Sequence, residues 1–130
     1  MQTTLKVRGF HIDVYRHVNN ARYLEFLETA RWEWLDNKEG FQWMAKNNIA
    51  FIVVNININY RKPAVLGDVL LIDSQLEQLN GRSGVIKQVI SCQGETVSDA
   101  LLTFVCIDLQ TQKALPLDGQ LLEKLQQLKE

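Results

Sequence analysis

The sequence has almost no net charge, because 14 lysines and arginines stand against 15 aspartates and glutamates and leave −1 at neutral pH. A balanced surface lacks the positive field that holds a polyanion, which argues against a general nucleic-acid binder and against a protein held on anionic membranes. Blocks of like charge and low-complexity stretches, which are typical of disordered tails, are also missing. We therefore expect a folded protein that has no nucleic-acid partner.

Long apolar runs and paired cysteines are scarce as well. The longest uninterrupted apolar run is 49–54, far short of the roughly 20 residues that cross a bilayer, so we expect no stable membrane insertion. Residues 1–6 lack the apolar core of a secretory signal peptide. Cys92 and Cys106 lie in separate apolar segments without a Cys-x-x-Cys spacing, and they suit buried positions in a reducing compartment. Together these absences predict a cytoplasmic protein.

The composition that is present is that of an ordinary globular protein, with 46% hydrophobic and 22% charged residues in a chain of 130. That length fits one hydrophobic core and leaves no room for a second. A chain of this size buries about two-thirds of its unfolded surface and folds without disulfides or a structural metal. The sequence therefore predicts a single domain over residues 1–130.

A long helix is predicted in the first third of the chain. Apolar residues recur at helical spacing over 21–35, at Tyr23, Phe26, Leu27, Ala30 and Trp34. Asn19 or Asn20 can cap this helix, because an asparagine side chain accepts a hydrogen bond from a free backbone N–H of the first turn. We also expect a short helix over 41–47 and a last helix after Asp118, its expected cap.

From residue 51 the hydrophobic period drops to two, which is typical of half-buried strands. In this stretch Val54, Ile56, Ile58 and Tyr60 alternate with Asn55, Asn57, Asn59 and Arg61. Further strands are expected at 69–79, 85–92 and 97–107, with a hairpin at Asn80-Gly81 and a short first strand within 4–12. Strands in meander order favour an antiparallel sheet with the long helix on its apolar face, an α+β fold. The exposed edges of such a sheet predict dimerisation.

The polar residues that could do chemistry lie directly before the long helix, in the segment 11–20. Asp13 supplies a carboxylate that can serve as a general base or as a nucleophile. The first turn of the helix leaves backbone N–H groups unpaired, and such donors stabilise the oxyanion formed in acyl transfer. Together they suffice to hydrolyse an activated acyl group, although an Asp near a helix start serves more often as a loop or capping residue.

Metal binding is the alternative use of the same segment. His11, Asp13 and His17 offer two imidazoles and a carboxylate, the ligand set of non-haem iron oxygenases. However, all three come from the seven consecutive residues 11–17, and no other strand offers a partner to complete a site. We therefore expect no metal, and we interpret His11 as a solvated strand end.

Other residue types that could carry chemistry give weaker signals. The sequence has no Gly-x-Ser-x-Gly, no glycine-rich phosphate loop and no dinucleotide fingerprint. Cys106 lies in a predicted buried strand, which disfavours a thiol nucleophile. Three tryptophans favour core packing over a ligand pocket by about two to one; they are Trp32, Trp34 and Trp43.

Two stretches resemble the 4-hydroxybenzoyl-CoA thioesterase group of the hot-dog fold. The first reads Asp13-x-x-x-His17-Val18-Asn19-Asn20-Ala21-x-Tyr23-Leu24-x-Phe26. The second reads Asn59-Tyr60-Arg61-Lys62-Pro63-Ala64-Val65-Leu66-Gly67-Asp68, which is similar to that group's Tyr-x-x-Pro-Ala-x-x-Gly-Asp segment. The resemblance extends over nearly the whole chain, and within the group the sequence looks most like the bacterial long-chain acyl-CoA thioesterases.

The resemblance implies a hot-dog fold, in which one antiparallel sheet wraps around a central long helix. It implies that Asp13 is the catalytic carboxylate, and that the helix start at Asn20 polarises the thioester carbonyl through its backbone N–H. His17, Asn19 and Tyr23 are then supporting residues of the site. The resemblance also implies a homodimer or homotetramer with sites at the subunit interface, and it implies neither a metal nor a cofactor.

The phosphates of CoA require positively charged partners. The resemblance places Arg82 and Ser83 near them, and electrostatics adds Arg61 and Lys62, although basic turns of this kind are more often merely solvated. Many relatives carry a glycine shortly after the catalytic Asp, where this chain has Val-Tyr-Arg at 14–16. That departure leaves the acyl preference open.

We therefore expect an enzyme that hydrolyses long-chain fatty acyl-CoA to the free acid and CoA. The alternative is a non-catalytic hot-dog module that binds or senses acyl-CoA, because a fold does not by itself imply turnover. An intact carboxylate at Asp13 favours the enzyme.

Overall fold

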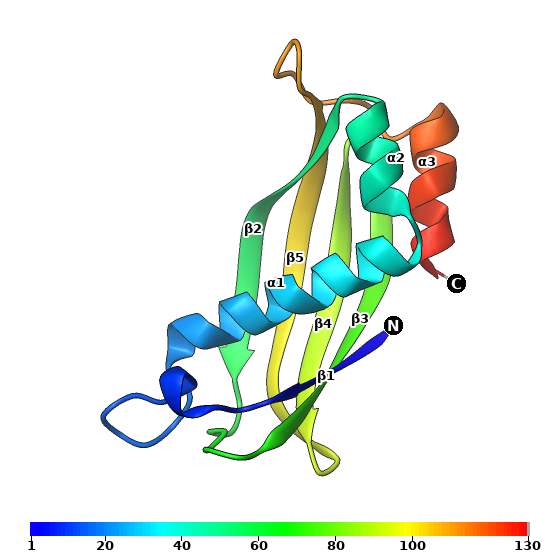
Figure 1. The fold of residues 1–130 in the computed structure, drawn as a ribbon. Helices are drawn as coiled ribbons and strands as arrows, with labels where there is room; N and C mark the ends of the chain where they lie inside the picture. Colours follow the sequence, from blue (N-terminus) through cyan, green and yellow to red (C-terminus); the bar gives the residue numbers. More distant parts are fainter. Residues whose placement is uncertain (130) are drawn as a thin grey trace.

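The computed structural model describes residues 1–129, which form a curved sheet with one long helix lying across it (Figure 1). The elements in chain order are β1 (Gln2–Lys6), the 3₁₀ turn η1 (Gly9–His11), α1 (Asn20–Asn37), α2 (Gly40–Lys46), β2 (Ile49–Tyr60), β3 (Val69–Asn80), β4 (Ser83–Cys92), β5 (Glu95–Asp108), α3 (Gly119–Gln126) and the 3₁₀ turn η2 (Gln127–Lys129). The helices and long strands lie where the sequence periodicity predicts them, with ends shifted by one or two residues. None of the helices in residues 1–129 has the length and hydropathy needed to cross a bilayer.

The sheet has five strands in the order β1-β3-β4-β5-β2, and every neighbouring pair is antiparallel. The expected antiparallel sheet is therefore confirmed, but the expected meander holds only for β3, β4 and β5. The strand β2 pairs with β5 and not with β3, its successor in the chain. A tight turn would be needed to pair β2 with β3, whereas residues 61–68 carry the chain past β5 and β4 instead.

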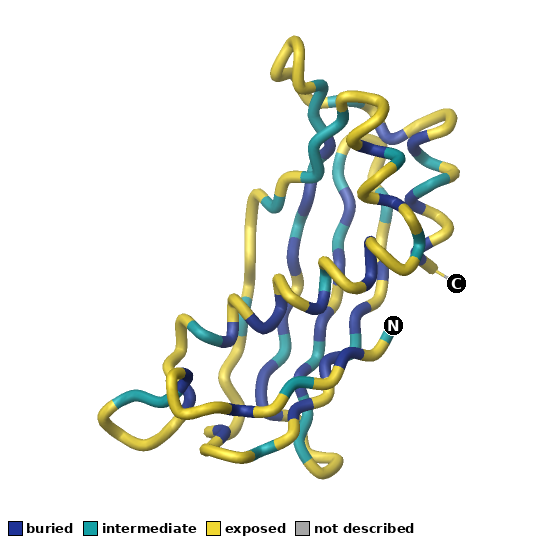
Figure 2. Tube along the Cα trace, viewed as in Figure 1, coloured by how far each residue is buried: buried dark blue, intermediate teal, exposed yellow. Residues whose placement is uncertain are grey.

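The helix α1 packs against the sheet through the apolar stripe that the sequence predicts. Tyr23, Phe26, Leu27, Ala30 and Trp34 are all buried. Asn19 is the N-cap, because its Oδ1 accepts a hydrogen bond from the backbone N–H of Ala21 at 2.9 Å. The buried stripe meets buried side chains of β3, β4 and β5, so the core lies between α1 and the middle of the sheet (Figure 2).

The N-terminal segment differs from the predicted strand within 4–12. The strand ends at Lys6, and Gly9–His11 form a 3₁₀ turn instead. His11 is buried rather than a solvated strand end: its Nδ1 accepts the backbone N–H of Arg8 at 2.9 Å, and its ring packs edge-on against Phe26 at 4.8 Å between centroids. Contact with an aromatic residue of α1 turns this histidine inward, and the local sequence pattern holds no information on that contact.

The strand β2 is the less covered edge of the sheet. Its expected half-buried face is more exposed than predicted, with Val54 55%, Ile56 38% and Tyr60 44% exposed. The reason is that α1 crosses β1 and β3 closely and leaves β2 open, as Figure 2 shows for most of its length. The strand bulges between Val53 and Asn55, and none of its twelve residues is charged.

The C-terminal helix α3 closes one end of the core. Leu121, Leu125 and Leu128 are buried, as the amphipathic pattern predicts. Asp118 stands at the expected N-cap position, but its side chain accepts no capping hydrogen bond.

Candidate active site

A short closed loop holds Asp13 beside the start of α1. The backbone N–H of Asp13 donates to the carbonyl of His17 at 3.0 Å, and Arg16 donates back to the carbonyl of Asp13 at 3.0 Å. Arg16 adopts a left-handed φ of 63°, which lets the chain reverse within these few residues. An isolated bridge between Ile12 and Val18 closes the base of the loop. The loop therefore fixes the backbone of Asp13 without regular secondary structure.

The carboxylate of Asp13 has one oriented oxygen. Its Oδ1 accepts the backbone N–H of Tyr15 at 2.9 Å, and the residue is half-buried. Within residues 1–129 no hydrogen bond occupies Oδ2. A carboxylate that is oriented through one oxygen, and whose other oxygen has no hydrogen-bond partner among the described residues, can accept a proton from water or attack a carbonyl carbon.

The first turn of α1 offers a backbone donor next to this carboxylate. The cap formed by Asn19 uses the N–H of Ala21, and the N–H of Asn19 itself donates to the carbonyl of His11 at 2.9 Å. In the described chain the N–H of Asn20 has no hydrogen-bond partner. A free N–H at the positive end of an 18-residue helix is suited to hold a developing oxyanion.

Two tyrosines tie the helix start to the sheet. The Tyr60 hydroxyl donates to the carbonyl of Asn20 at 3.2 Å, and the Tyr23 hydroxyl accepts the backbone N–H of Ala64 at 3.2 Å. The two rings meet edge-on with centroids 5.4 Å apart. Burial raises the pKa of Tyr23, so it stays a neutral phenol at physiological pH. Tyr60 lies on the predicted apolar face of β2 and was not among the predicted site residues. The available signal was its place in the second stretch that resembles the thioesterase group, where it is the tyrosine of the Tyr-x-x-Pro-Ala-x-x-Gly-Asp segment.

A cavity of about 610 Å³ brings most of the predicted site residues together. The predicted residues that line it are Asp13, His17, Asn19, Asn20, Tyr23, Arg61 and Lys62. Four further residues complete the wall without having been predicted, namely Tyr15, Val18, Tyr60 and Pro63.

The two cations at the rim of this cavity are already paired. Arg61 makes two hydrogen bonds to Asp99, of 2.8 and 3.3 Å, and Lys62 pairs with Glu95. The guanidinium of Arg61 lowers the pKa of Asp99, so the pair stays charged at neutral pH. Both pairs are solvent-exposed and therefore easily rearranged when an anion competes for the cations.

The structure does not bring Arg82 and Ser83 to this cavity within one chain. They follow the β3–β4 turn, where Gly81 accepts the backbone N–H of Leu117 at 2.6 Å just before α3. Figure 1 shows this turn at the end of the sheet remote from the loop that carries Asp13. A site within a single chain thus lacks two of the residues predicted to bind CoA.

The remaining candidates have structural positions. Burial raises the pKa of Cys106 to about 12, which keeps it a thiol and unreactive. In the part of the chain that the structure describes, no three His, Cys, Asp or Glu side chains are grouped as metal ligands. Trp34 is buried in the core, whereas Trp43 packs beside Lys124 and Trp32 is 45% exposed. The tryptophans are therefore divided between core and surface.

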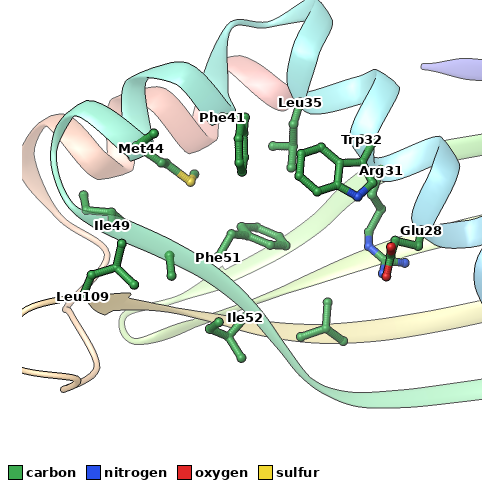
Figure 3. Close-up of a pocket in the computed structure, with 13 residues that line it drawn as sticks. Glu28, Arg31, Trp32, Leu35, Phe41, Met44, Ile49, Phe51, Ile52 and Leu109 are labelled. Atoms are coloured by element: carbon green, nitrogen blue, oxygen red, sulfur yellow. The ribbon is translucent and has the colours of Figure 1, made fainter.

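A second cavity, of about 500 Å³, lies between the C-terminal half of α1, α2 and the start of β2 (Figure 3). Its walls are mainly apolar, with Leu35 and Trp32 from α1, Phe41 and Met44 from α2, and Phe51 from β2. The charged side chains Glu28 and Arg31 stand at one side of it. The molecule thus has a polar cavity at one end of α1 and an apolar cavity at the other end.

The polar cavity combines a carboxylate with a helix-terminal N–H donor, which is the equipment of an acyl-transfer hydrolase. The comparisons with known proteins agree with that class. Residues 7–125 match the Thioesterase-like superfamily. The chain belongs to this superfamily, and its five-stranded antiparallel sheet around a long helix is the hot-dog fold expected from the sequence.

Individual proteins are similar to the chain as well. The chain is 68% identical over 130 residues to the long-chain acyl-CoA thioesterase FadM of Escherichia coli K12, covering 98% of each chain. It is 30% identical over 98 residues to the acyl-CoA thioesterase YbgC of Haemophilus influenzae, covering 74% of this chain and 72% of the relative. The crystal structure of YbaW, a probable thioesterase from Escherichia coli, superposes with a TM-score of 0.95 at 66% identity, covering 100% and 99% of the two chains.

Proposed function

We propose that the protein hydrolyses long-chain fatty acyl-CoA thioesters to the free acid and CoA. The observation that carries this proposal is the half-buried carboxylate of Asp13 beside the free N–H of Asn20, in a cavity rimmed by Arg61 and Lys62. The similarity to a long-chain acyl-CoA thioesterase over 98% of both chains supports the substrate class.

The proposed reaction needs only the groups in this cavity. Asp13 takes a proton from a water molecule while the water oxygen attacks the thioester carbonyl carbon, and the N–H of Asn20 stabilises the resulting oxyanion. Collapse of the tetrahedral intermediate breaks the carbon–sulfur bond, and the leaving CoA thiolate takes up the proton that Asp13 accepted from water, which returns Asp13 to a carboxylate. Direct attack by Asp13 would give a mixed anhydride that water then hydrolyses to the same products. No cofactor is required, because the thioester is already activated.

The functional unit that we propose is a homodimer formed through β2. Natural sheet edges are commonly blocked by charges, proline or short length, and the other edge strand, β1, has five residues and carries Lys6. By contrast β2 presents twelve uncharged residues, including exposed Val54 and Ile56. Pairing of two β2 strands would cover that edge and extend one sheet across both protomers. A tetramer of such dimers is the larger assembly expected from the sequence.

The dimer also gives Arg82 and Ser83 a role. A two-fold axis at the middle of β2 reverses the partner's sheet, so the remote β3–β4 turn of one protomer lies at the same end as the Asp13 loop of the other. The partner subunit's Arg82 could then meet the CoA phosphates at a cavity that Arg61 and Lys62 already rim.

The cytoplasm is the location that we propose for this activity.

The test is release of free thiol from palmitoyl-CoA, followed with a thiol reagent alongside a binding measurement on the same preparation. The proposal predicts saturable thiol release with substrate turnover. Saturable binding of palmitoyl-CoA without thiol release would instead identify the non-catalytic binding or sensing module.

A further inference from the structure

His11 has no part in the proposed chemistry, yet it is buried directly before the Asp13 loop, with only 9% of its surface exposed. We propose that His11 is a positioning residue, which holds the Asp13 carboxylate and the free N–H of Asn20 at a fixed separation, and which does so only as a neutral imidazole. This inference rests on the proposed thioesterase function and adds a residue that acts on the reaction through others.

The backbone of His11 joins the two arms of the Asp13 loop. Its carbonyl accepts the backbone N–H of Asn19 at 2.9 Å. Inside this bond lie the bridge and the hydrogen bond that close the loop, so the two arms are tied by a short ladder. Asp13 stands on the first arm, and Asn20 directly follows the second. The separation of the two reacting groups is therefore set by how firmly the arms are joined.

The same bond decides which donor at the start of α1 stays free. The N–H of Asn19 is used by His11, that of Ala21 by the Asn19 side chain, and that of Arg22 by the Asn19 carbonyl at 2.9 Å. Among residues 19–22 of the described chain, this leaves the N–H of Asn20 as the free donor. Without the His11 carbonyl, the N–H of Asn19 would compete with it for the oxyanion.

The side chain of His11 anchors this ladder in the core. Its Nδ1 accepts the backbone N–H of Arg8 at 2.9 Å, which fixes the 3₁₀ turn before the loop. Its ring meets Phe26 edge-on with centroids 4.8 Å apart and Phe10 with centroids 4.2 Å apart. Because Phe26 belongs to the buried stripe of α1, the arm that carries Asp13 is fastened to the helix whose first turn carries the oxyanion donor.

The hydrogen bond from Arg8 requires a neutral ring. An imidazole nitrogen accepts a hydrogen bond only when it carries no proton, so the ring proton of His11 lies on Nε2. Burial lowers the pKa of His11, and the charge of Arg22 lowers it further, against the opposite effect of Glu25 and with a smaller contribution from Arg8. Protonation of Nδ1 would place one donor against another, which breaks the anchor of the loop.

Two substitutions separate the hydrogen bond from the ring packing. In His11→Asn the side-chain oxygen stands where Nδ1 stood and can accept the N–H of Arg8, but the ring is lost. His11→Phe keeps a ring against Phe26 and loses the acceptor. We expect His11→Asn to retain most of the native kcat for palmitoyl-CoA. His11→Phe should lower kcat roughly tenfold to a hundredfold, the usual cost of a misplacement of about 1 Å, with KM changed much less.

A residue that only fills the core predicts the reverse order. His11→Phe would then be the better tolerated change, and kcat per folded molecule would stay native in both variants. Leu125→Ala is the control for loss of stability, because Leu125 is fully buried under α3, at the end of the sheet remote from the Asp13 loop (Figure 1). It should lower the melting temperature and leave kcat unchanged.

The protonation state is tested by the pH dependence of the ratio of native kcat to that of His11→Asn. Protonation of Asp13 lowers kcat in both proteins and cancels in this ratio. The chain has two histidines, so the imidazole signal that is missing from the NMR spectrum of His11→Asn belongs to His11. We expect the ratio to fall in acid with the same midpoint as the NMR titration of His11 in the native protein.

Each outcome decides one statement. Native kcat in folded His11→Phe would overturn the positioning role, as would a loss in His11→Asn as large as that in His11→Phe. A ratio that stays constant while His11 titrates, or a His11 that takes up no proton before the protein unfolds, would overturn the dependence on the neutral ring. If His11→Phe does not fold, the comparison of the native protein with His11→Asn still decides both. An Asp13→Asn protein with native turnover would instead contradict the proposed function itself.

Discussion

The two ends of α1 form cavities of similar size by different means. At the N-terminal end, backbone hydrogen bonds of the Asp13 loop and the Asn19 cap fix the polar groups in place. At the C-terminal end, side-chain packing of Phe41, Phe51 and their neighbours forms the walls. Reactive groups need defined direction, which hydrogen bonds supply, whereas an alkyl chain needs only volume and apolar surface. The two ends of α1 therefore differ in what holds them: directed hydrogen bonds at the polar end and side-chain packing at the apolar end.

Removing the charge of Asp13 should abolish the chemistry of the polar end. We expect Asp13→Asn to lower kcat by roughly a hundredfold to ten-thousandfold, the usual contribution of a general base, and by more if the route is covalent. The amide oxygen of Asn can still accept the N–H of Tyr15, so the loop and the melting temperature should change little. Thiol release and thermal unfolding are measured on the same sample.

Asp118→Asn provides the matched control for that substitution. Asp118 is exposed, makes no capping hydrogen bond and lies at the start of α3, so the same chemical change there should leave kcat as it is. If Asp13 were only a loop residue, its variant would lose about 1 kcal/mol of stability and keep near-native turnover.

A charge on the β2 edge should separate the two protomers of the proposed dimer. Ile56→Lys would bury two like charges across the two-fold axis, which we expect to weaken the dimer by roughly 3–5 kcal/mol, a hundredfold or more in the dissociation constant. Activity on palmitoyl-CoA should fall with it. Thr4→Lys, an exposed position on the β1 edge, is the comparison. An Ile56→Lys protein that sediments as a native-like dimer would show that the pairing surface lies elsewhere.

Tyr23 should affect stability more than catalysis. In Tyr23→Phe the buried N–H of Ala64 loses its acceptor, and an unsatisfied buried donor costs about 1–3 kcal/mol. We expect that loss in urea unfolding, with kcat changed less than by Asp13→Asn. A larger effect on kcat than on stability would instead assign Tyr23 a direct role in the reaction.

The rim cations should contribute least. Arg61→Ala is expected to raise KM for palmitoyl-CoA by no more than about fivefold with little change in kcat, because Arg61 is solvent-exposed and exposed charge interactions are weak. The effect should diminish as salt is added. A KM that is unchanged at low salt would leave Arg61 as a surface partner of Asp99 alone.

The pairing of Asp99 also predicts a small pH effect on stability. Because Arg61 lowers the pKa of Asp99 in the folded state, the stabilisation is complete above the ordinary pKa of an aspartate. It is lost as the pH falls through the lowered, folded-state pKa. Unfolding midpoints of native protein and Asp99→Asn should therefore converge in acid, and midpoints that stay equally far apart at every pH would contradict this.

Sequence patterns predicted what local spacing determines. The buried stripe from Tyr23 to Trp34, the Asn19 cap and the alternation along β2 all follow from period and residue type. The neighbour of β2 was mispredicted because strand order depends on contacts between distant segments, here β2 with β5.

The candidate site shows the same limit. Segment 11–20 was found because its polar residues are adjacent in the sequence, and Asp13 and Asn20 do line one cavity. Tyr60 was missed because it reaches Asn20 from a strand forty residues later. The apolar cavity was missed as well, since its walls come from α1, α2 and β2 and no single period marks them.

The measurement that tests the account most directly is the chain-length profile of the native protein. Acyl-CoAs from butyryl to palmitoyl are assayed for kcat/KM below their micelle-forming concentrations. If the protein is the long-chain acyl-CoA thioesterase that we propose, kcat/KM should rise by up to about fourfold per added methylene and exceed the butyryl value at least a hundredfold for the long chains. A flat profile, or one that falls with length, would contradict the proposed preference for long acyl chains.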